Sequence, residues 1–243
     1  MTRMFLLAGV AGFSLLAAPL APSALAQTPA GAAASATAPA AGWQDGLFGV
    51  RADAARGRIL IRLPAGEDGV LGRYIYHPQV AAGLGMDGGG IDRSRIGQTQ
   101  IVAFHKVGNR VQARFENHRY HALNADTYQE EAVAASFAPS VVWSGDIVET
   151  GADGSVTVDI TSFLERDVLN AAGSLRRARQ GTYRLAPALG YVDVAETRVF
   201  PENIQFQVVQ TFTSDEPGPG VSRVAPDGRS VTIAVAQSFF RLP

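Results

Sequence analysis

The hydrophobic positions of this chain recur mostly at the spacing of a β-strand. Residues 110–116 (RVQARFE) alternate polar and apolar side chains, and residues 58–63 (RILIRL) are apolar with polar interruptions. A period of two places the apolar side chains on one face of an extended segment, which can then be half-buried. The pattern therefore predicts that strands dominate the fold.

Three pairs of apolar segments are separated by residues that favour turns, and each pair predicts an antiparallel hairpin. Gly108-Asn109 and Asp153-Gly154 separate the first two pairs, and both tolerate the positive φ of a tight turn. A loop rich in Pro and Gly, containing Pro226-Asp227-Gly228, separates the third. The paired segments are residues 99–107 with 110–116, 141–149 with 155–160, and 204–213 with 230–239.

Helical signals are fewer. Residues 127–137 (TYQEEAVAASF) carry acidic residues early, small apolar residues later and Pro139 beyond their end, which predicts a helix of about three turns. A shorter helix is predicted over residues 162–170. The sequence shows no alternation of predicted strands and helices of the kind that builds a parallel sheet. We therefore predict a mainly β (α+β) fold, with antiparallel sheets built from hairpins and one or two short helices.

Composition divides the chain into three parts. Residues 1–26 combine Arg3, a long apolar stretch and the cleavage motif Ala24-Leu25-Ala26, which is the pattern of a signal peptide. Residues 27–42 hold almost only Ala, Gly, Pro, Ser and Thr, with too few anchoring side chains to order the segment. We therefore expect a periplasmic or secreted protein, with a disordered linker followed by one β-rich domain over residues 43–243.

Composition and charge also narrow the function classes. The chain has no Cys, so neither disulfides nor cysteine metal sites stabilise it. Its formal net charge of -1 gives no long-range field for nucleic acid or anionic membranes. No apolar run after the signal peptide approaches the roughly 18 residues that cross a bilayer, so no membrane partner is expected after cleavage. The local cluster of Arg176, Arg177 and Arg179 is interpreted as a solvated face.

A glycine-rich stretch, GLGMDGGGIDR over residues 83–93, spells G-x-G-x-x-G at Gly83, Gly85 and Gly88. This lettering marks a dinucleotide site only when a strand precedes it and a helix follows it, because the helix N-terminus faces the pyrophosphate. The residues that follow are polar and end at Gly97, directly before a predicted strand. We therefore interpret the stretch as a connecting loop with positive-φ positions, without a nucleotide.

Candidate metal ligands are few. His118 and His121 are three residues apart and Asp126 lies nearby, but at the end of a strand positions three apart point to opposite faces. Both histidines are therefore interpreted as facing solvent. Asp87 and Asp92 lack the six or more oxygens of a calcium site. The motifs of serine hydrolases, phosphate-binding loops and zinc peptidases do not occur. The sequence assigns no catalytic, cofactor-binding or metal-binding residue, and no cofactor.

Several short segments follow one another in an order and spacing that carry a family resemblance. They are VLGR (70–73), GLG and IDR within 83–93, NHRYHA (117–122), AVAASFAPSVV (132–142), DGSVTVDITSFLERD (153–167), VFPEN (199–203), Thr211-Phe212 and SFFRLP (238–243). Together they resemble the non-catalytic N-terminal region of a family of large exported bacterial zinc-dependent metalloproteases. The likeness extends from about Trp43 to the C-terminus.

In that family the chain continues into a domain whose helix carries H-E-x-x-H, where two histidines bind zinc and the glutamate activates water. This sequence stops at Pro243 without that motif, so the resemblance implies a fragment or a truncated product, and no catalytic residue carries over. It also implies a role in supporting, regulating or positioning a peptidase domain, which alone would hold zinc. At the positions of His118 and His121 the family pattern has an apolar residue and an arginine, which argues further against a metal role.

Two other interpretations stay open: a stand-alone periplasmic binding or scaffolding module, and a hydrolase built on the histidines and Asp126. A last expectation concerns the end of the chain. Adjacent positions face opposite sides of a strand, so Phe239 and Phe240 do not both enter one core unless the strand bends. We expect one of them to form, with Leu242, an exposed apolar patch that binds the peptidase domain or a second copy.

Overall fold

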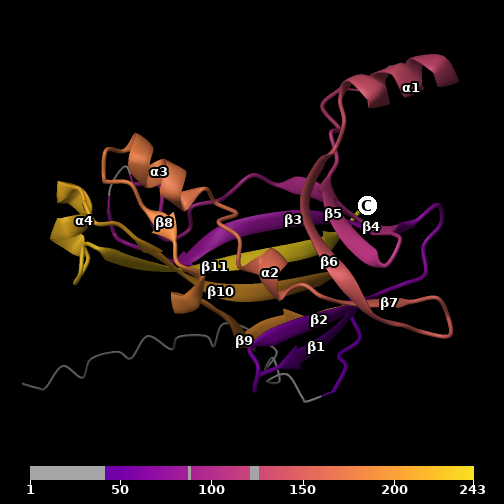
Figure 1. Ribbon diagram of the computed structural model, residues 1–243, viewed down its shortest axis with the longest axis horizontal. Coiled ribbons are helices and arrows are strands. Elements are labelled where there is room, and N and C mark those ends of the chain that lie inside the picture. The colour runs from indigo at the N-terminus through magenta and orange to yellow at the C-terminus, as the bar shows by residue number, and fades with distance from the viewer. Residues whose placement is uncertain (1–41, 87–88, 121–125) are drawn as a thin grey trace, which may run out of the picture. The chain divides into compact units, whose positions relative to one another are not determined.

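The computed structural model describes residues 42–86, 89–120 and 126–243. In these residues eleven strands form one antiparallel sheet, accompanied by four short α-helices and a 3-10 turn (Figure 1). The predicted class, mainly β with an antiparallel sheet, is therefore confirmed. The signal peptide and nearly all of the linker lie outside the described residues, so both remain expectations.

The elements have the following bounds. The strands are β1 (Gly49–Asp53), β2 (Arg58–Leu63), β3 (Val70–Ala82), β4 (Gln100–Val107), β5 (Arg110–Phe115), β6 (Ser140–Thr150), β7 (Val156–Asp159), β8 (Arg184–Leu185), β9 (Tyr191–Val199), β10 (Asn203–Thr213) and β11 (Ser230–Arg241). The helices are α1 (Thr127–Ser136), α2 (Thr161–Leu164), α3 (Ala171–Arg177), α4 (Pro219–Val224) and the 3-10 turn η1 (Pro187–Leu189). Of the helices in this part of the chain, none is long and apolar enough to span a bilayer.

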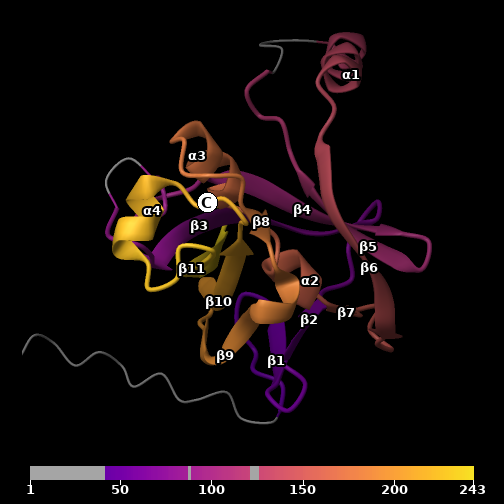
Figure 2. The ribbon, with the colours of Figure 1, turned by 60° about the vertical axis from the view of Figure 1, so that its left-hand side comes forward.

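The sheet curls back on itself. Its strands follow the order β1-β2-β7-β6-β5-β4-β3-β11-β10-β8, and β9 also pairs with β10. The N–H of Leu47, directly before β1, donates to the carbonyl oxygen of Phe200, directly after β9, at 2.9 Å. The segments beside β1 and β9 therefore meet, and the inner face of the sheet encloses a core (Figure 2).

All three predicted hairpins are confirmed. They are formed by β4 with β5, β6 with β7, and β10 with β11. Gly108 (φ 57°) and Gly154 (φ 81°) adopt the positive φ that their turns require. Pairing in the third hairpin runs without interruption from Asn203 opposite Phe240 to Thr213 opposite Ser230. Local alternation and turn chemistry were sufficient to place these strands.

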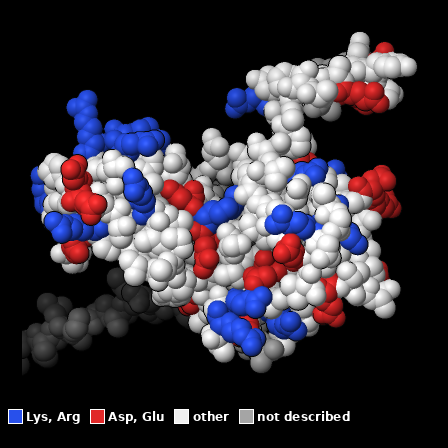
Figure 3. All heavy atoms as spheres, viewed as in Figure 1, with Lys and Arg blue, Asp and Glu red and all other residues white. Residues whose placement is uncertain are grey.

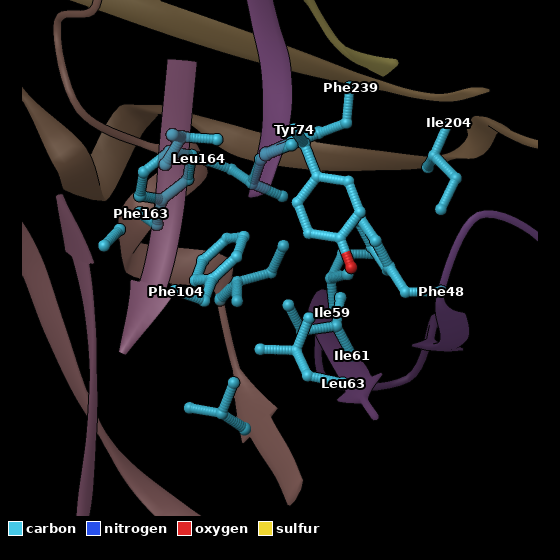
Figure 4. Close-up of a cluster of buried hydrophobic side chains, with 14 of the residues drawn as sticks. Phe48, Ile59, Ile61, Leu63, Tyr74, Phe104, Phe163, Leu164, Ile204 and Phe239 are labelled. Carbon is cyan, nitrogen blue, oxygen red and sulfur yellow. The ribbon is translucent and has the colours of Figure 1, made fainter. Parts of the chain in front are cut away.

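The main core lies inside the curled sheet (Figure 4). Phe239 stands near its centre, with ring centroids 5.2 Å from Tyr76, 6.0 Å from Phe163 and 5.9 Å from Phe206. Helix α2 contributes Phe163 and Leu164, both fully buried. Edge-to-face and tilted aromatic pairs of this kind add to the stabilisation from burial alone. The core thus ties α2 to strands that are distant in sequence.

A second, smaller core lies at the other end of the long hairpin β10–β11. Its buried residues come from the glycine-rich loop, α3, the residue before β8, α4 with the residue after it, and the two strands. They are Met86, Ile91, Ala171, Leu175, Tyr183, Phe212, Val221, Ala225, Val231, Ile233 and Val235. Burial of these side chains holds α3 and α4 against the hairpin (Figure 1). Helix α4 was not predicted, because it lies within the loop rich in Pro and Gly.

The helix predictions had two outcomes. The helix predicted over residues 127–137 is confirmed as α1. The helix predicted over residues 162–170 is wrong, because α2 ends early and a separate helix, α3, follows it. Asn170 has a left-handed φ of 51°, and the Asp167 carboxylate accepts hydrogen bonds from the N–H groups of Ala171 and Ala172 at 2.7 and 3.0 Å. A break followed by a capped start produces a new helix.

Strands β1, β3, β8 and β9 were not predicted. The longest of them, β3, contains Pro78, which argues against a strand because proline cannot donate a ladder hydrogen bond. In the structure, Pro78 lies beyond the part of β3 that pairs with β4. Pairing of β3 with β4 stops at Tyr76 opposite Gln100, and beyond it the Pro78 carbonyl oxygen accepts a hydrogen bond from the N–H of Gly97 at 2.8 Å.

The end of β11 follows the predicted alternation. Phe239 is fully buried, whereas Phe240 is 38% exposed on the opposite face of the sheet. Leu242 is half-buried. The exposed position is therefore Phe240, and whether it binds a partner remains a prediction.

Candidate docking site

One segment stands apart from the sheet. We call it the α1 arm and define it as residues 117–120 and 126–139, which lie between β5 and β6. The pairing of these strands ends at Phe115 opposite Ser140, and beyond that pair the chain leads α1 away from the sheet in both views (Figures 1 and 2). The arm is thus an extension of a hairpin with a helix near its tip.

Helix α1 is defined by its own end residues. The Asp126 carboxylate caps the first turn by accepting a hydrogen bond from the N–H of Gln129 at 2.9 Å. At the other end the N–H of Phe137 donates to the carbonyl oxygen of Val133. The Phe137 ring stacks on Tyr120, with centroids 4.0 Å apart and planes inclined by 12°. This stack joins the two sides of the arm at its base.

Helix α1 has no buried face in the described structure. Apart from Val133, which is half-buried, every side chain of α1 whose burial is described is exposed. Tyr128 is the extreme case, at 83% exposed. An isolated helix of ten residues is marginal in water, since most helical stability in proteins comes from packing of an apolar face. The α1 arm therefore presents unpartnered surface.

A groove runs from the base of the arm to α3 and consists of three adjoining hollows. The first, of about 650 Å³, lies at the arm base, and the second, of about 240 Å³, shares Gln98, Gln100 and Phe115 with it. The third, of about 380 Å³, reaches α3 and shares Gln98 and Val168 with the second. We call these hollows together the arm groove.

The floor of the arm groove holds a desolvated guanidinium group. Arg166 donates from Nε to the carbonyl oxygen of Phe163 (2.9 Å) and from Nη1 to that of Val142 (3.1 Å). Its guanidinium carbon lies 4.2 Å from the centroid of the Phe163 ring, in a cation–π contact. Burial lowers the pKa of Arg166, yet arginine stays charged in proteins. The group braces α2 against β6 and leaves a fixed positive charge beneath the groove.

At the arm base an acid holds two basic side chains. Glu116 accepts hydrogen bonds from Arg73 Nε and from His118 Nε2, each at 2.8 Å. Burial alone would raise the pKa of Glu116, but these two contacts outweigh it and hold the pKa below its ordinary value. His118 is therefore engaged with Glu116, and the three side chains form a hydrogen-bonded network beside the groove.

The far end of the groove is basic. Arg95 and Arg177 line the third hollow, and Arg177 donates to the Ser174 hydroxyl at 2.9 Å. The cluster predicted as a solvated face, Arg176, Arg177 and Arg179, is exposed as expected. Figure 3 shows basic side chains gathered where Figure 1 places α3.

The metal candidates of the sequence are not brought together in the described residues. His118 bonds to Glu116, and Asp126 caps α1. His121 and Asp87 lie outside the described residues, and Asp92 is exposed. Within residues 42–86, 89–120 and 126–243, no group of three or more potential His, Asp or Glu ligands is close enough to share a metal ion.

The glycine-rich stretch serves packing where it is described. Ile91 is buried in the second core, and a side chain at Gly83 would collide with the carbonyl oxygen of Ile91. Gly90 has a φ of 67° and lies against Ser174 of α3. The residues after Gly90 form bends and turns up to β4, without a helix. The helix that a dinucleotide site requires is therefore missing at this position.

Sequence reasoning missed the groove. Its lining residues come from segments more than sixty positions apart, such as Gln98 and Arg166, and nothing in the local pattern joins them. Only the arm left a local signal in the sequence. Residues 127–137 begin with a polar run and so have no continuous apolar stripe, which indicates a helix that packs weakly on the rest of the fold.

The comparisons with known proteins give one match. A family model described as a domain of unknown function, DUF5117, matches residues 94–243. The matched range contains the α1 arm and most of the groove lining, but not Tyr76 and Pro78 of the second hollow. No curated protein and no solved structure gives a significant match.

Proposed function

This chain belongs to the DUF5117 family of domains of unknown function, and on that premise we propose that it is a non-catalytic docking module for a zinc peptidase domain, working outside the cytoplasm. The module would support, regulate or position its partner without adding catalytic groups of its own.

One observation carries the docking role. Helix α1 lies away from the sheet, beyond the stack of Tyr120 on Phe137 at the base of the arm, and its described side chains are almost all exposed. A protein that orders a ten-residue helix without burying it gains little stability from doing so. Partner binding would bury this helix. Tyr128 suits the role of an anchor, because tyrosine is enriched among the residues that dominate interface energies.

The identity of the partner rests on the resemblance to the N-terminal region of zinc-dependent metalloproteases. That resemblance includes residues 117–120 and 132–139 of the arm, whereas residues 126–131, with Tyr128, lie between the shared segments. Part of the arm thus coincides with segments shared with proteins that carry a peptidase domain downstream. This coincidence supports a peptidase domain as the partner.

A binding experiment tests the proposal. The purified chain is titrated against a separately produced H-E-x-x-H peptidase domain of the resembling family, and both affinity and peptidase activity are measured. Y128A should weaken binding about tenfold or more, the loss expected for a buried tyrosine anchor. Y191A removes another exposed tyrosine, on β9, and should leave the affinity unchanged.

The outcomes are distinct. Binding that depends on Tyr128 supports the proposal. Absence of binding to any such domain would contradict it and favour a stand-alone binding or scaffolding module. Binding that is insensitive to Y128A would remove the arm from the interface.

A further inference from the structure

The third hollow of the arm groove combines apolar and basic side chains. Ile96 is 58% exposed and lines the hollow beside Val168 and Leu169. Arg95 and Arg177 lie at the same hollow, and Arg93, Arg176 and Arg179 are exposed nearby in sequence. Among the described residues, no carboxylate forms an ion pair with any of these five arginines.

Such a surface suits one kind of occupant. An apolar strip flanked by guanidinium groups that have no acidic partner among the described residues favours a segment that combines an aromatic or aliphatic anchor with carboxylates, because arginine recognises carboxylates with directed hydrogen bonds. A purely anionic ligand would leave Ile96 and Leu169 in water. The occupant is therefore expected to be an acidic, amphipathic peptide segment.

The same chain presents a segment of this chemistry. Helix α1 displays Tyr128 with Glu131 on the same side, three residues later, and Glu130 on the next face, and all three side chains are exposed. In the described part of the chain neither glutamate forms an ion pair. Figure 3 shows acidic side chains on the arm and basic side chains around α3. The charges of these two surfaces of one protein are therefore complementary.

We propose that two copies of this chain associate by exchanging their α1 arms, each arm docking in the third hollow of the other copy's groove. Tyr128 would pack on Ile96 and Leu169, and Glu131, three residues later on the same side of the helix, would face Arg95 and Arg177. Glu130, on the next face of α1, adds to the negative charge of the arm. Because one copy offers both the arm and the groove, a two-fold arrangement satisfies both contacts at once. The inference rests on the proposed docking role of α1 but not on the peptidase link. A peptidase domain that takes α1 would compete with the second copy.

Charge reversal tests the exchange. Sedimentation velocity is run on the full exported chain, on E130R/E131R and on R95E/R177E, each over a concentration series. We expect dimers of the wild type at micromolar concentration and a loss of affinity of at least about tenfold for either variant, because each would place like charges opposite one another twice per dimer. The control R223E/R229E changes the net charge as R95E/R177E does, outside the groove, and should still form dimers.

The mixture of the two variants is decisive. In it, the reversed arm of one variant meets the reversed groove of the other, and the remaining contact is the wild-type pair, so a heterodimer of wild-type affinity should form. Circular dichroism and thermal unfolding confirm that each variant is folded. A wild type that stays monomeric at all concentrations would overturn the proposal, and so would dimers that persist in both variants or a mixture that does not associate. A negative result here leaves peptidase binding unaffected, since that complex is measured separately.

Discussion

At the scale of single residues, a few polar side chains inside the core link elements that are distant in sequence. Tyr76 and Gln237 are both almost completely buried, and the Tyr76 hydroxyl donates to Gln237 Oε1 at 2.6 Å. Gln237 Nε2 in turn donates to the carbonyl oxygen of Leu164. Burial raises the pKa of Tyr76, so the hydroxyl stays protonated and remains a donor. This chain of bonds links β3, β11 and α2.

The substitution Y76F tests that link. It leaves Gln237 Oε1 buried without a donor, which should lower the free energy of unfolding by about 1–3 kcal/mol. Y74F is the matched control, since the Tyr74 hydroxyl has no hydrogen-bond partner among the described residues and burial raises its pKa to about 12. Urea unfolding of both variants measures the difference. Equal losses would show that the Gln237 bond contributes nothing specific.

A second residue-scale prediction concerns Asp159. Burial alone would raise its pKa, but hydrogen bonds from Thr161 and the pairing with Arg58 (2.6 Å) outweigh this effect and hold the pKa below its ordinary value. A carboxyl with a lowered folded-state pKa stabilises the fold fully above its unfolded-state pKa, near 3.9, and loses this contribution as the pH falls through the folded-state value.

The variant D159N lacks the titrating group. Its deficit in unfolding free energy relative to the wild type should be constant between pH 5 and 7 and should shrink as the pH falls below about 4. Urea titrations at a series of pH values measure the deficit. A gap that stays constant or widens in acid would contradict the role assigned to the ion pair.

At the scale of elements, alternation along β11 places two adjacent phenylalanines on opposite faces of the sheet. Phe239 lies among the rings of the main core, whereas Phe240 is partly exposed on the outer face. F239A should therefore destabilise the fold by about 3–5 kcal/mol, the cost of emptying a buried aromatic position. F240A should cost well under half as much, and denaturant unfolding of the pair would reveal the asymmetry. Similar losses would mean that the outer face is packed as tightly as the core.

Elements could be predicted from the sequence where neighbouring residues determine them, and not where contacts between distant segments do. The β4–β5 and β10–β11 hairpins follow from alternation and turn residues. By contrast, β3 was hidden by Pro78, whose missing N–H is tolerated because the pairing of β3 with β4 stops at Tyr76, before the proline. The break between α2 and α3 depends on the conformation of Asn170 and the cap from Asp167. The arm groove joins distant segments, so no local pattern could indicate it.

At the scale of the whole molecule, the elements that stabilise the described fold are not the ones that present the unpartnered surface. The two cores hold the sheet, α2, α3 and α4 together, and α1 belongs to neither of them. Replacing residues 117–139 with Asn-Gly should therefore shift the thermal unfolding midpoint by only a few degrees, since the described residues of this segment bury little surface. The control V221D places a charge in the second core and should cause severe destabilisation. A deletion as damaging as V221D would show that the arm is a structural part of the fold.

Hydrogen–deuterium exchange of α1, with and without the zinc peptidase domain and at a concentration where the chain alone is monomeric, tests the docking role most directly. Residues 127–136 have few buried contacts, so they should exchange rapidly in the free chain, close to the rate of frayed ends. Binding of the peptidase domain should slow their exchange by an order of magnitude or more, while α4 stays unchanged. Rapid exchange of α1 in both samples, with the complex demonstrably formed, would contradict the assignment of the α1 arm as the docking element.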